Sequence, residues 1–322
     1  MFKVTARVLA TVLPPLIPPL GPRVLGGRDL EVFCVNLTPK QLALMSVLAG
    51  YDVPERLLPR VNCSLSVGQL ARALLQEPPP CGPEGEGARA LEAILRDEAL
   101  LKLWVTDYIN HNHTNGFVGY AFEDARGAVL AAFRGSESTH GCAPSNVDWW
   151  DNVRAPLLGS AQYDDVRRFA ARHARRPLLF TGHSKGAHNA LYALATSQNT
   201  AARAVVFDAQ GFARGQLSEA ERAALEERAL NYVQRDDVVG ALLWHPERRI
   251  FAQGVGEGNP HALSAMAFDE AGYPIPARRT LRSRAAGIMS RALYERLQPR
   301  VGGSGSPEGN ALWRGPGVEP LA

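Results

Sequence analysis

The feature that most constrains the fold is a serine between two glycines at residues 182–186, with the sequence GHSKG. It directly follows a short apolar run at 177–181 (PLLFT), and helix-forming residues come after it at 187–195 (AHNALYALA). A buried strand, a sharp turn and a helix in this order form a nucleophile elbow, whose turn holds a serine hydroxyl above the edge of a sheet. Glycines flank the serine because side chains there would collide with neighbouring backbone. The pattern therefore predicts that Ser184 lies on such a turn.

Predicted strands and helices alternate on both sides of this turn. Two apolar runs at 117–122 and 128–133 predict a hairpin, because the segment between them ends in glycine. Further helices are predicted at 161–173, 185–196 and 217–228, and further strands at 177–181, 204–207, 229–233 and 249–253. Such alternation favours an α/β fold with a largely parallel sheet that helices cover on both faces.

The chain before the hairpin has a helical pattern. Thr38 and Pro39 provide a cap and a first-turn proline for a helical region that extends to residue 75 and includes a second helix at 67–75. A run rich in proline and glycine at 78–85 predicts an exposed loop. Apolar residues at helical spacing then predict a helix from residue 88 to about residue 108.

Length and composition favour a single α/β domain with additions at its ends. A chain of 322 residues, of which 46% are hydrophobic, can bury a large core. The domain is expected at 32–298, with a helical lid or cap region, a catalytic core and a basic helical end at 32–113, 114–270 and 271–298. A proline-rich leader or arm precedes it at 1–31, and a disordered tail rich in glycine, serine and proline follows at 299–322.

Charge and cysteine usage exclude several classes of partner. The net charge of +3 is small, so nothing demands a nucleic acid. The segment from Arg278 to Arg300, however, contains seven arginines and only one acidic residue, Glu295. Such a segment is typical of a solvated helix face, and the alternative is a basic surface for anionic lipid. The four cysteines lack metal-ligand spacing, and we expect neither a metal nor another cofactor.

The amino-terminal segment bears on location. An apolar stretch follows Lys3 and Arg7, but prolines interrupt it and no small-residue cleavage site follows. No apolar run approaches the length that spans a bilayer. We therefore expect a cytoplasmic protein, with secretion or delivery as an effector left open.

An exposed serine hydroxyl becomes a nucleophile only beside a base that a carboxylate orients. In folds with this elbow the order along the chain is serine, acid, histidine, so the base follows Ser184. His188 lies on the helix that the elbow begins, which favours a structural role, and His245 precedes a proline. His261 lies in a loop rich in glycine and proline after the last predicted strand, where this base is expected. His261 is the preferred base, and His245 is the alternative.

The acid and the oxyanion donors are sought at strand ends. Asp236 and Asp237 follow one predicted strand and Asp208 follows the strand before it, so spacing alone does not separate them. The oxyanion hole needs two donors, one of which is usually the amide of the residue after the nucleophile, here Lys185. Ser136 lies in the loop after an earlier predicted strand, and its amide, its hydroxyl or both could be the second oxyanion donor.

Several segments in the right order resemble the lipase class 3 group of α/β-hydrolases. They are Gln162, the elbow, and residues 132–136 (AFRGS), 148–152 (DWWDN) and 237–239 (DVV). The chain resembles still more closely the bacterial Mbeg-like family, in its GHSKG elbow, in residues 208–212 (DAQGF) and in residues 239–243 (VGALL) followed by a histidine loop. The resemblance implies an α/β-hydrolase fold from about residue 37 to 268, an oxyanion donor at Ser136 and Asp237 as the acid. Residues 209–210 (AQ) replace the family's Gly-Pro, so Asp208 stays an alternative acid.

The residues and the resemblance together predict a serine ester hydrolase with a lipid or other acyl ester as substrate. Ser184, Asp237 and His261 would act through an acyl-enzyme, with Ser136 and Lys185 as the oxyanion donors. The alternatives are a lipase-like protein that binds without turnover, and thioesterase or acyltransferase chemistry on the same three residues.

Overall fold

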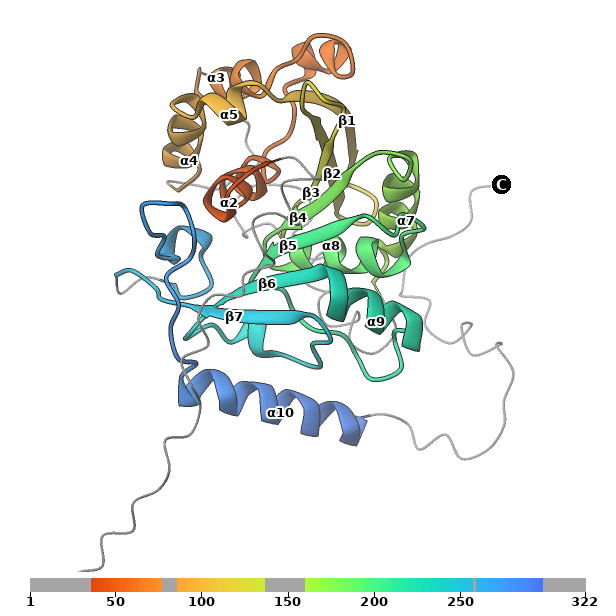
Figure 1. Ribbon diagram of the computed structural model, residues 1–322, viewed down its shortest axis with the longest axis vertical. Coiled ribbons are helices and arrows are strands. Elements are labelled where there is room, and N and C mark those ends of the chain that lie inside the picture. The colour runs from red at the N-terminus through yellow and green to blue at the C-terminus, as the bar shows by residue number, and fades with distance from the viewer. Residues whose placement is uncertain (1–35, 77–85, 137–159, 257–258, 298–322) are drawn as a thin grey trace, which may run out of the picture.

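The computed structural model describes residues 36–76, 86–136, 160–256 and 259–297. Seven strands form one sheet, and their order in space is their order in the chain (Figure 1). The first three strands pair antiparallel, and every later neighbour pairs parallel. The strands are β1 (Trp104–His111), β2 (Phe117–Glu123), β3 (Val129–Phe133), β4 (Leu178–Gly182), β5 (Arg203–Phe207), β6 (Ala229–Gln234) and β7 (Arg248–Ala252). The expected α/β-hydrolase fold, with its mostly parallel sheet and amino-terminal helical region, is confirmed.

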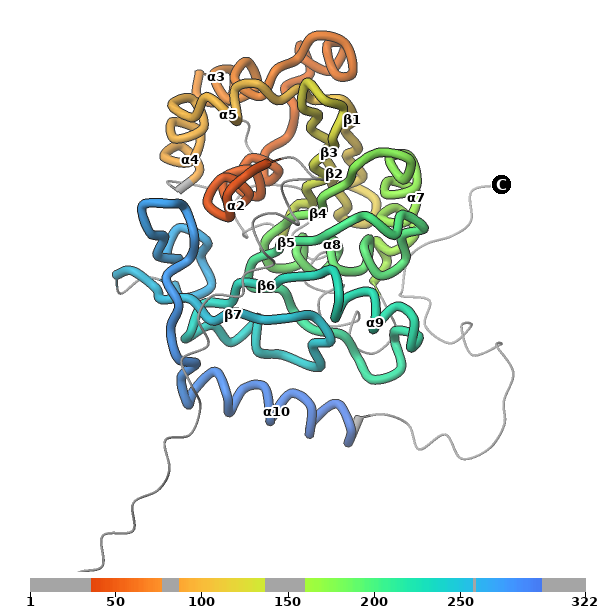
Figure 2. The backbone as a smooth tube through the Cα atoms, viewed as in Figure 1, coloured from red at the N-terminus to blue at the C-terminus, as the bar shows by residue number. Residues whose placement is uncertain are grey.

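The helices fall into three groups along the chain. Before the sheet lie α2 (Pro39–Leu48), η1 (Glu55–Arg60), α3 (Val67–Gln76), α4 (Glu86–Leu95) and α5 (Glu98–Leu101). Between strands lie α7 (Tyr163–Arg172), α8 (Lys185–Thr196), α9 (Glu219–Arg228) and η2 (Val239–Ala241). After β7 come η3 (Leu263–Ala265) and α10 (Leu281–Leu297), which Figure 2 shows in blue at the opposite end of the molecule from α3. No helix among the described residues is long and apolar enough to cross a membrane.

The expected cap at Thr38 is present. Its hydroxyl accepts a hydrogen bond from the amide of Gln41 at 3.3 Å, and the Gln41 side chain accepts one from the Thr38 amide at 2.8 Å. This reciprocal capping box satisfies two amides that the first turn would otherwise leave without acceptors, and Pro39 is preset for the first turn.

The helix predicted up to residue 108 is wrong at its carboxyl end. Helix α4 ends at Leu95, and Asp97 then caps the amino terminus of the short helix α5. Strand β1 begins at Trp104. The apolar residues around Leu103 fit either a helix or a strand, because short apolar runs do not distinguish the two. Pairing along the whole length of β2 decides for a strand.

The two faces of the sheet belong to two different cores. On one face, residues such as Phe133 and Phe180 pack with α7, α8 and α9. On the other, Tyr120, Phe207 and Tyr232 pack with α2, α3 and α4. Strands that follow one another across the sheet, joined by crossovers of one hand, place their connecting helices on the same face. The amino-terminal helices therefore form the layer that covers the other face.

Several expectations fall outside the described residues. They concern the leader at 1–31, the loop at 78–85, the motif at 148–152 and the tail at 299–322. The domain boundaries proposed from the sequence stay predictions.

Candidate active site

Ser184 lies on a strained turn between β4 and α8. Its φ of 57° and ψ of −121° are unusual for a residue with a side chain, and its amide donates to the carbonyl of Phe207 at 3.0 Å. The flanking glycines are required by space. A Cβ on Gly182 would lie 2.4 Å from the carbonyl carbon of Gly186, and a Cβ on Gly186 would lie 2.1 Å from the carbonyl oxygen of Phe133. The elbow predicted from GHSKG is confirmed as a local structure.

His261 and Asp237 form a hydrogen-bonded row with Ser184. His261 Nε2 lies 2.8 Å from Ser184 Oγ, and its Nδ1 lies 3.1 Å from Asp237 Oδ1. Asp237 is buried and also accepts hydrogen bonds from the amides of Val239 at 3.0 Å and Gly240 at 2.6 Å. With Asp237 Oδ1 as the acceptor, Nδ1 of His261 donates to it, and Nε2 is left to accept from the hydroxyl of Ser184.

Asp208 lies beside this row but does not hydrogen-bond to the ring of His261. Its Oδ1 accepts from the amide of Gln234 at 2.7 Å and its Oδ2 accepts from Gln234 Nε2 at 3.2 Å. Its backbone φ is 51°, and its side chain is fully buried. Burial, reinforced by the charge of Asp237, raises the pKa of Asp208 well above its ordinary value. Asp237, and not Asp208, therefore lies against the ring of His261.

Two side chains that the sequence did not single out hold the loop that carries the base. His183 Nε2 donates to the carbonyl of His261 at 2.8 Å, and Gln234 Nε2 donates to the carbonyl of Ala262 at 2.8 Å. Burial, together with the nearby His261, lowers the pKa of His183 to about 3, so its ring is neutral. Both residues stand at the carboxyl edge of the sheet, in the elbow and at the end of β6, and this position is the signal that could have identified them.

The predicted oxyanion loop lies against the elbow. A Cβ on Gly135 would lie 2.9 Å from the carbonyl oxygen of His183 and 3.8 Å from Ser184 Cβ, which places the residue before Ser136 next to Ser184. Arg134 is buried, forms an ion pair with Asp52 and donates to the carbonyl of Ala49 at 3.3 Å. The amino-terminal helical region thus anchors the start of this loop.

The second expected oxyanion donor stands at a helix end. Lys185 is the first residue of α8, so its amide lies at the positive end of the helix dipole. Its role, like that of Ser136, stays a prediction.

The other candidate residues have structural partners. His188 is buried, with Nε2 at 2.7 Å from the hydroxyl of Tyr163, as its helical position predicted. His245 forms a buried pair with Glu247, with 2.7 Å between Nδ1 and Oε1. Asp236 lies 3.5 Å from Arg235 at the surface.

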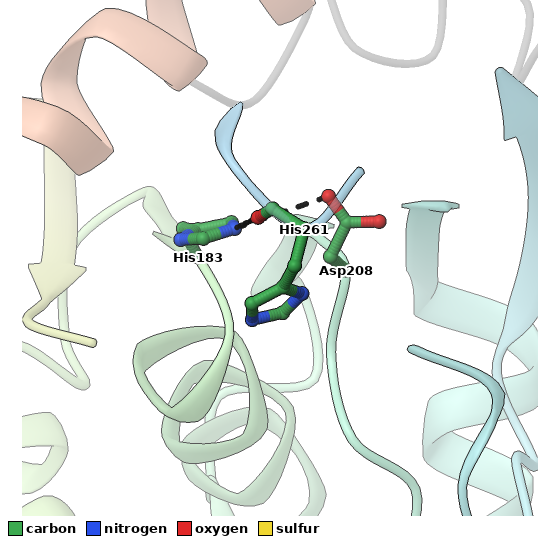
Figure 3. A group of neighbouring side chains, drawn as sticks. All are labelled: His183, Asp208 and His261. Atoms are coloured by element: carbon green, nitrogen blue, oxygen red, sulfur yellow. Dashed lines mark hydrogen bonds and ion pairs between the residues drawn. The ribbon is translucent and has the colours of Figure 1, made fainter. Parts of the chain in front are cut away.

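A metal ion is conceivable where His183, Asp208 and His261 converge, as Figure 3 shows. One ligand atom from each lies within 4.8 Å of the others. The ring nitrogens of His261 already face Ser184 and Asp237, and both oxygens of Asp208 accept from Gln234. We therefore assign these atoms to the hydrogen-bond network and not to a cation.

Comparison with known proteins gives one family match. Residues 96–261, more than half of the chain, match the family model described as Mbeg1-like. Curated proteins give no match.

Three solved structures illustrate the structural neighbours. An MDLA mutant from Penicillium cyclopium is 15% identical, with a TM-score of 0.41, and the match covers 78% of this chain and 93% of that one. A deletion mutant of the Rhizomucor miehei lipase propeptide complex is 10% identical, with a TM-score of 0.42 and coverages of 80% and 76%. The lipase from Rhizopus microsporus var. chinensis is 13% identical, with a TM-score of 0.38 and coverages of 66% and 74%.

Proposed function

This chain belongs to the Mbeg1-like family, and from the geometry around Ser184 we propose that it is a serine ester hydrolase whose substrate is a lipid or another acyl ester. The observation that carries the proposal is the distance of 2.8 Å between Ser184 Oγ and His261 Nε2, on a ring whose other nitrogen faces a buried carboxylate. This pairing gives a serine hydroxyl an adjacent base, which is what nucleophilic attack on an ester carbonyl requires.

In the proposed acylation step, Ser184 Oγ attacks the ester carbonyl while His261 Nε2 takes the hydroxyl proton. The imidazolium that forms is stabilised by Asp237, which holds the ring in the required tautomer. The carbonyl oxygen of the ester becomes an oxyanion, for which the donors are Ser136 and the amide of Lys185. Collapse of the tetrahedral intermediate breaks the bond to the alcohol, which leaves with the proton from His261.

In the proposed deacylation step, water takes the place of the alcohol. His261 removes a proton from water as the water oxygen attacks the carbonyl carbon of the acyl-enzyme. The same proton passes from His261 to Ser184 Oγ when the acid product leaves. The reaction therefore needs no electron transfer and no group beyond the chain and water.

The test uses a fluorophosphonate probe, which reacts only with an activated serine, together with hydrolysis of short p-nitrophenyl esters. Wild type and the control variant Ser64→Ala, in which an exposed serine is removed, should be labelled and active. Ser184→Ala should be neither. Labelling or full activity of Ser184→Ala contradicts the proposal, and an unlabelled wild type would favour a lipase-like protein that binds without turnover.

The same assay separates the related chemistries. Faster turnover of thioesters than of matched oxygen esters would assign the site to thioester hydrolysis. Transfer of the acyl group to an added alcohol in preference to water would assign it to acyl transfer.

A further inference from the structure

Helix α10 has its large apolar residues on the side that faces solvent. Leu281, Ile288, Met289 and Leu293 keep 81%, 61%, 70% and 58% of their surface exposed. A helix that packs on a globular protein normally turns such residues inward. We call these four residues, with Arg282, Arg284 and Arg296, the α10 outer face.

Small and polar residues make the inward contacts of α10. A Cβ on Gly287 would lie 2.7 Å from the carbonyl oxygen of Ala241, and Ser290 Oγ accepts a hydrogen bond from the amide of Leu243 at 3.0 Å. Tyr294 is buried, and its ring stands edge-on to that of Trp244. The helix is thus attached to the protein without using its outer apolar residues, which leaves them available to a partner.

The exposed apolar residues form one stripe along the helix. Ile288, Met289 and Leu293 follow Leu281 by about 1.9, about 2.2 and about 3.3 helical turns, so all four project within roughly 140° of the helix circumference. They project away from η2 and the segment after it, against which Gly287 and Ser290 pack. Exposed apolar residues gathered on one side of an outer helix mark an interaction surface.

The charge around this stripe is positive and largely uncompensated. Within the part of the chain that the structure describes, the one acid of α10, Glu295, lies 3.6 Å from Arg214, and Arg282, Arg284 and Arg296 have no ion-pair partner.

More arginines lie at the base of the helix. Arg279 stacks over the ring of Phe251, as does Arg249 from β7, with 5.2 Å and 5.6 Å from guanidinium carbon to ring centroid. Burial and the positive charges of Arg249 and Arg291 lower the pKa of Arg279, which reflects this crowding. The surroundings of α10 thus favour an anionic partner.

We propose that the α10 outer face binds an anionic lipid surface. Leu281, Ile288, Met289 and Leu293 would enter the headgroup region, and the arginines would reach lipid phosphates with their long side chains. A second copy of this chain fits less well, because pairing two such faces would bring their arginines together. The inference goes beyond the proposed hydrolysis and does not depend on it.

The proposed docking helix packs on a segment that closely follows Asp237 in the chain. The inner side of α10 packs on η2, which begins two residues after Asp237.

The test measures co-sedimentation of the full chain with vesicles of phosphatidylserine and phosphatidylcholine, and with vesicles of phosphatidylcholine alone. Two double variants probe the surface: Arg282→Gln with Arg284→Gln for charge, and Ile288→Ser with Met289→Ser for apolar contact. Arg72→Gln with Arg89→Gln is the matched charge control, because these exposed arginines lie on α3 and α4. Circular dichroism checks that every variant is folded.

Wild type and the charge control should bind the anionic vesicles alike and bind neutral vesicles weakly. The α10 charge variant should bind about fivefold more weakly for each arginine removed. The apolar variant should lose at least about tenfold.

Three results would overturn the proposal. One is binding that is absent from wild type. Another is binding that the α10 variants and the control retain equally. The third is a dimer that Ile288→Ser with Met289→Ser dissociates, which would assign the surface to a second copy of the chain.

Discussion

The side chain of His183 holds the main chain of His261, through a hydrogen bond of 2.8 Å from Nε2 to the carbonyl oxygen. Because a carbonyl only accepts, the proton of the neutral His183 ring must be on Nε2. The residue before the proposed nucleophile therefore positions the proposed base, and their rings lie 4.9 Å apart between centroids. Ser184 and His261 are 77 residues apart in the sequence. The hydrogen bond from His183 holds the main chain of His261 beside Ser184.

We expect His183→Ala to lower kcat for p-nitrophenyl esters by about 10- to 100-fold, because small displacements of a catalytic group have effects of this size. KM should change little, since the bond positions His261 and does not contact substrate. His183→Gln keeps a donor and should recover part of the loss. His113→Ala, at an exposed histidine outside the site, is the control. Equal activities for the Ala and Gln variants would show that the loss of kcat does not come from the loss of the hydrogen bond.

His183 should also make the free energy of unfolding depend on pH. Its pKa falls from 6.5 in the unfolded chain to about 3 in the fold, so between these pH values the unfolded state binds a proton that the folded state does not. The free energy of unfolding should therefore fall as pH falls from about 6.5 towards 3. His183 keeps 22% of its side chain exposed, so water screens part of the effect.

This acid sensitivity is measured by comparing His183→Gln with wild type in urea unfolding across that range. The wild type should lose more stability than the variant on acidification. Parallel curves for the two proteins would contradict the lowered pKa.

Asp237 and Asp208 should respond very differently to the same substitution. Asp237→Asn removes the carboxylate that orients His261, and comparable changes cost about 10⁴-fold in kcat. Asp208→Asn replaces an acid whose pKa burial raises and whose oxygens bond to Gln234 and not to the ring of His261, so activity should fall by less than about tenfold. Steady-state kinetics of the two variants, with wild type as reference, decide between the acids. A larger loss for Asp208→Asn would reverse their roles.

The buried pair of His245 and Glu247 should be important for stability. Both side chains are almost fully inaccessible, and Glu247 also accepts from Asn231 at 3.0 Å. Although burial alone would raise the pKa of Glu247, the charge and hydrogen bond of His245 lower it overall. Glu247→Ala should reduce the free energy of unfolding by about 3–5 kcal/mol, because it leaves a buried partner unpaired.

Glu92→Ala is the matched control for this pair. Glu92 lies 2.8 Å from Arg96 on an exposed helix face, and removing such a pair should cost less than about 1 kcal/mol. Urea unfolding gives both values, and similar values for the two variants would count against a stabilising role of the buried pair.

The parts of the fold that the sequence predicted are those in which local pattern and tertiary packing agree. The helix at 185–196 has its predicted bounds, because the elbow begins it and small residues continue it against the sheet. The strand β1 was missed, because only its pairing with β2 distinguishes it from a helix.

The same distinction holds at the site. His261 could be chosen from its place after the last strand, which the topology of a parallel sheet makes meaningful. The choice between Asp237 and Asp208 depends on which carboxylate the loop of His261 reaches, and the contribution of His183 depends on a carbonyl 78 residues away. No local pattern records such distances.

The order of the strands has a consequence for how the chain is made. Helix α2 leaves the ribosome before the seven strands of the described sheet, yet Ser46 on it contacts Thr181 of β4, which is synthesised 135 residues later. Until β4 and β5 have been translated, the apolar side of α2 lacks most of the sheet that it covers in the folded protein. We therefore expect the nascent chain to pass through a long interval in which its first helices are exposed, and in which a chaperone would find its binding site near the amino terminus.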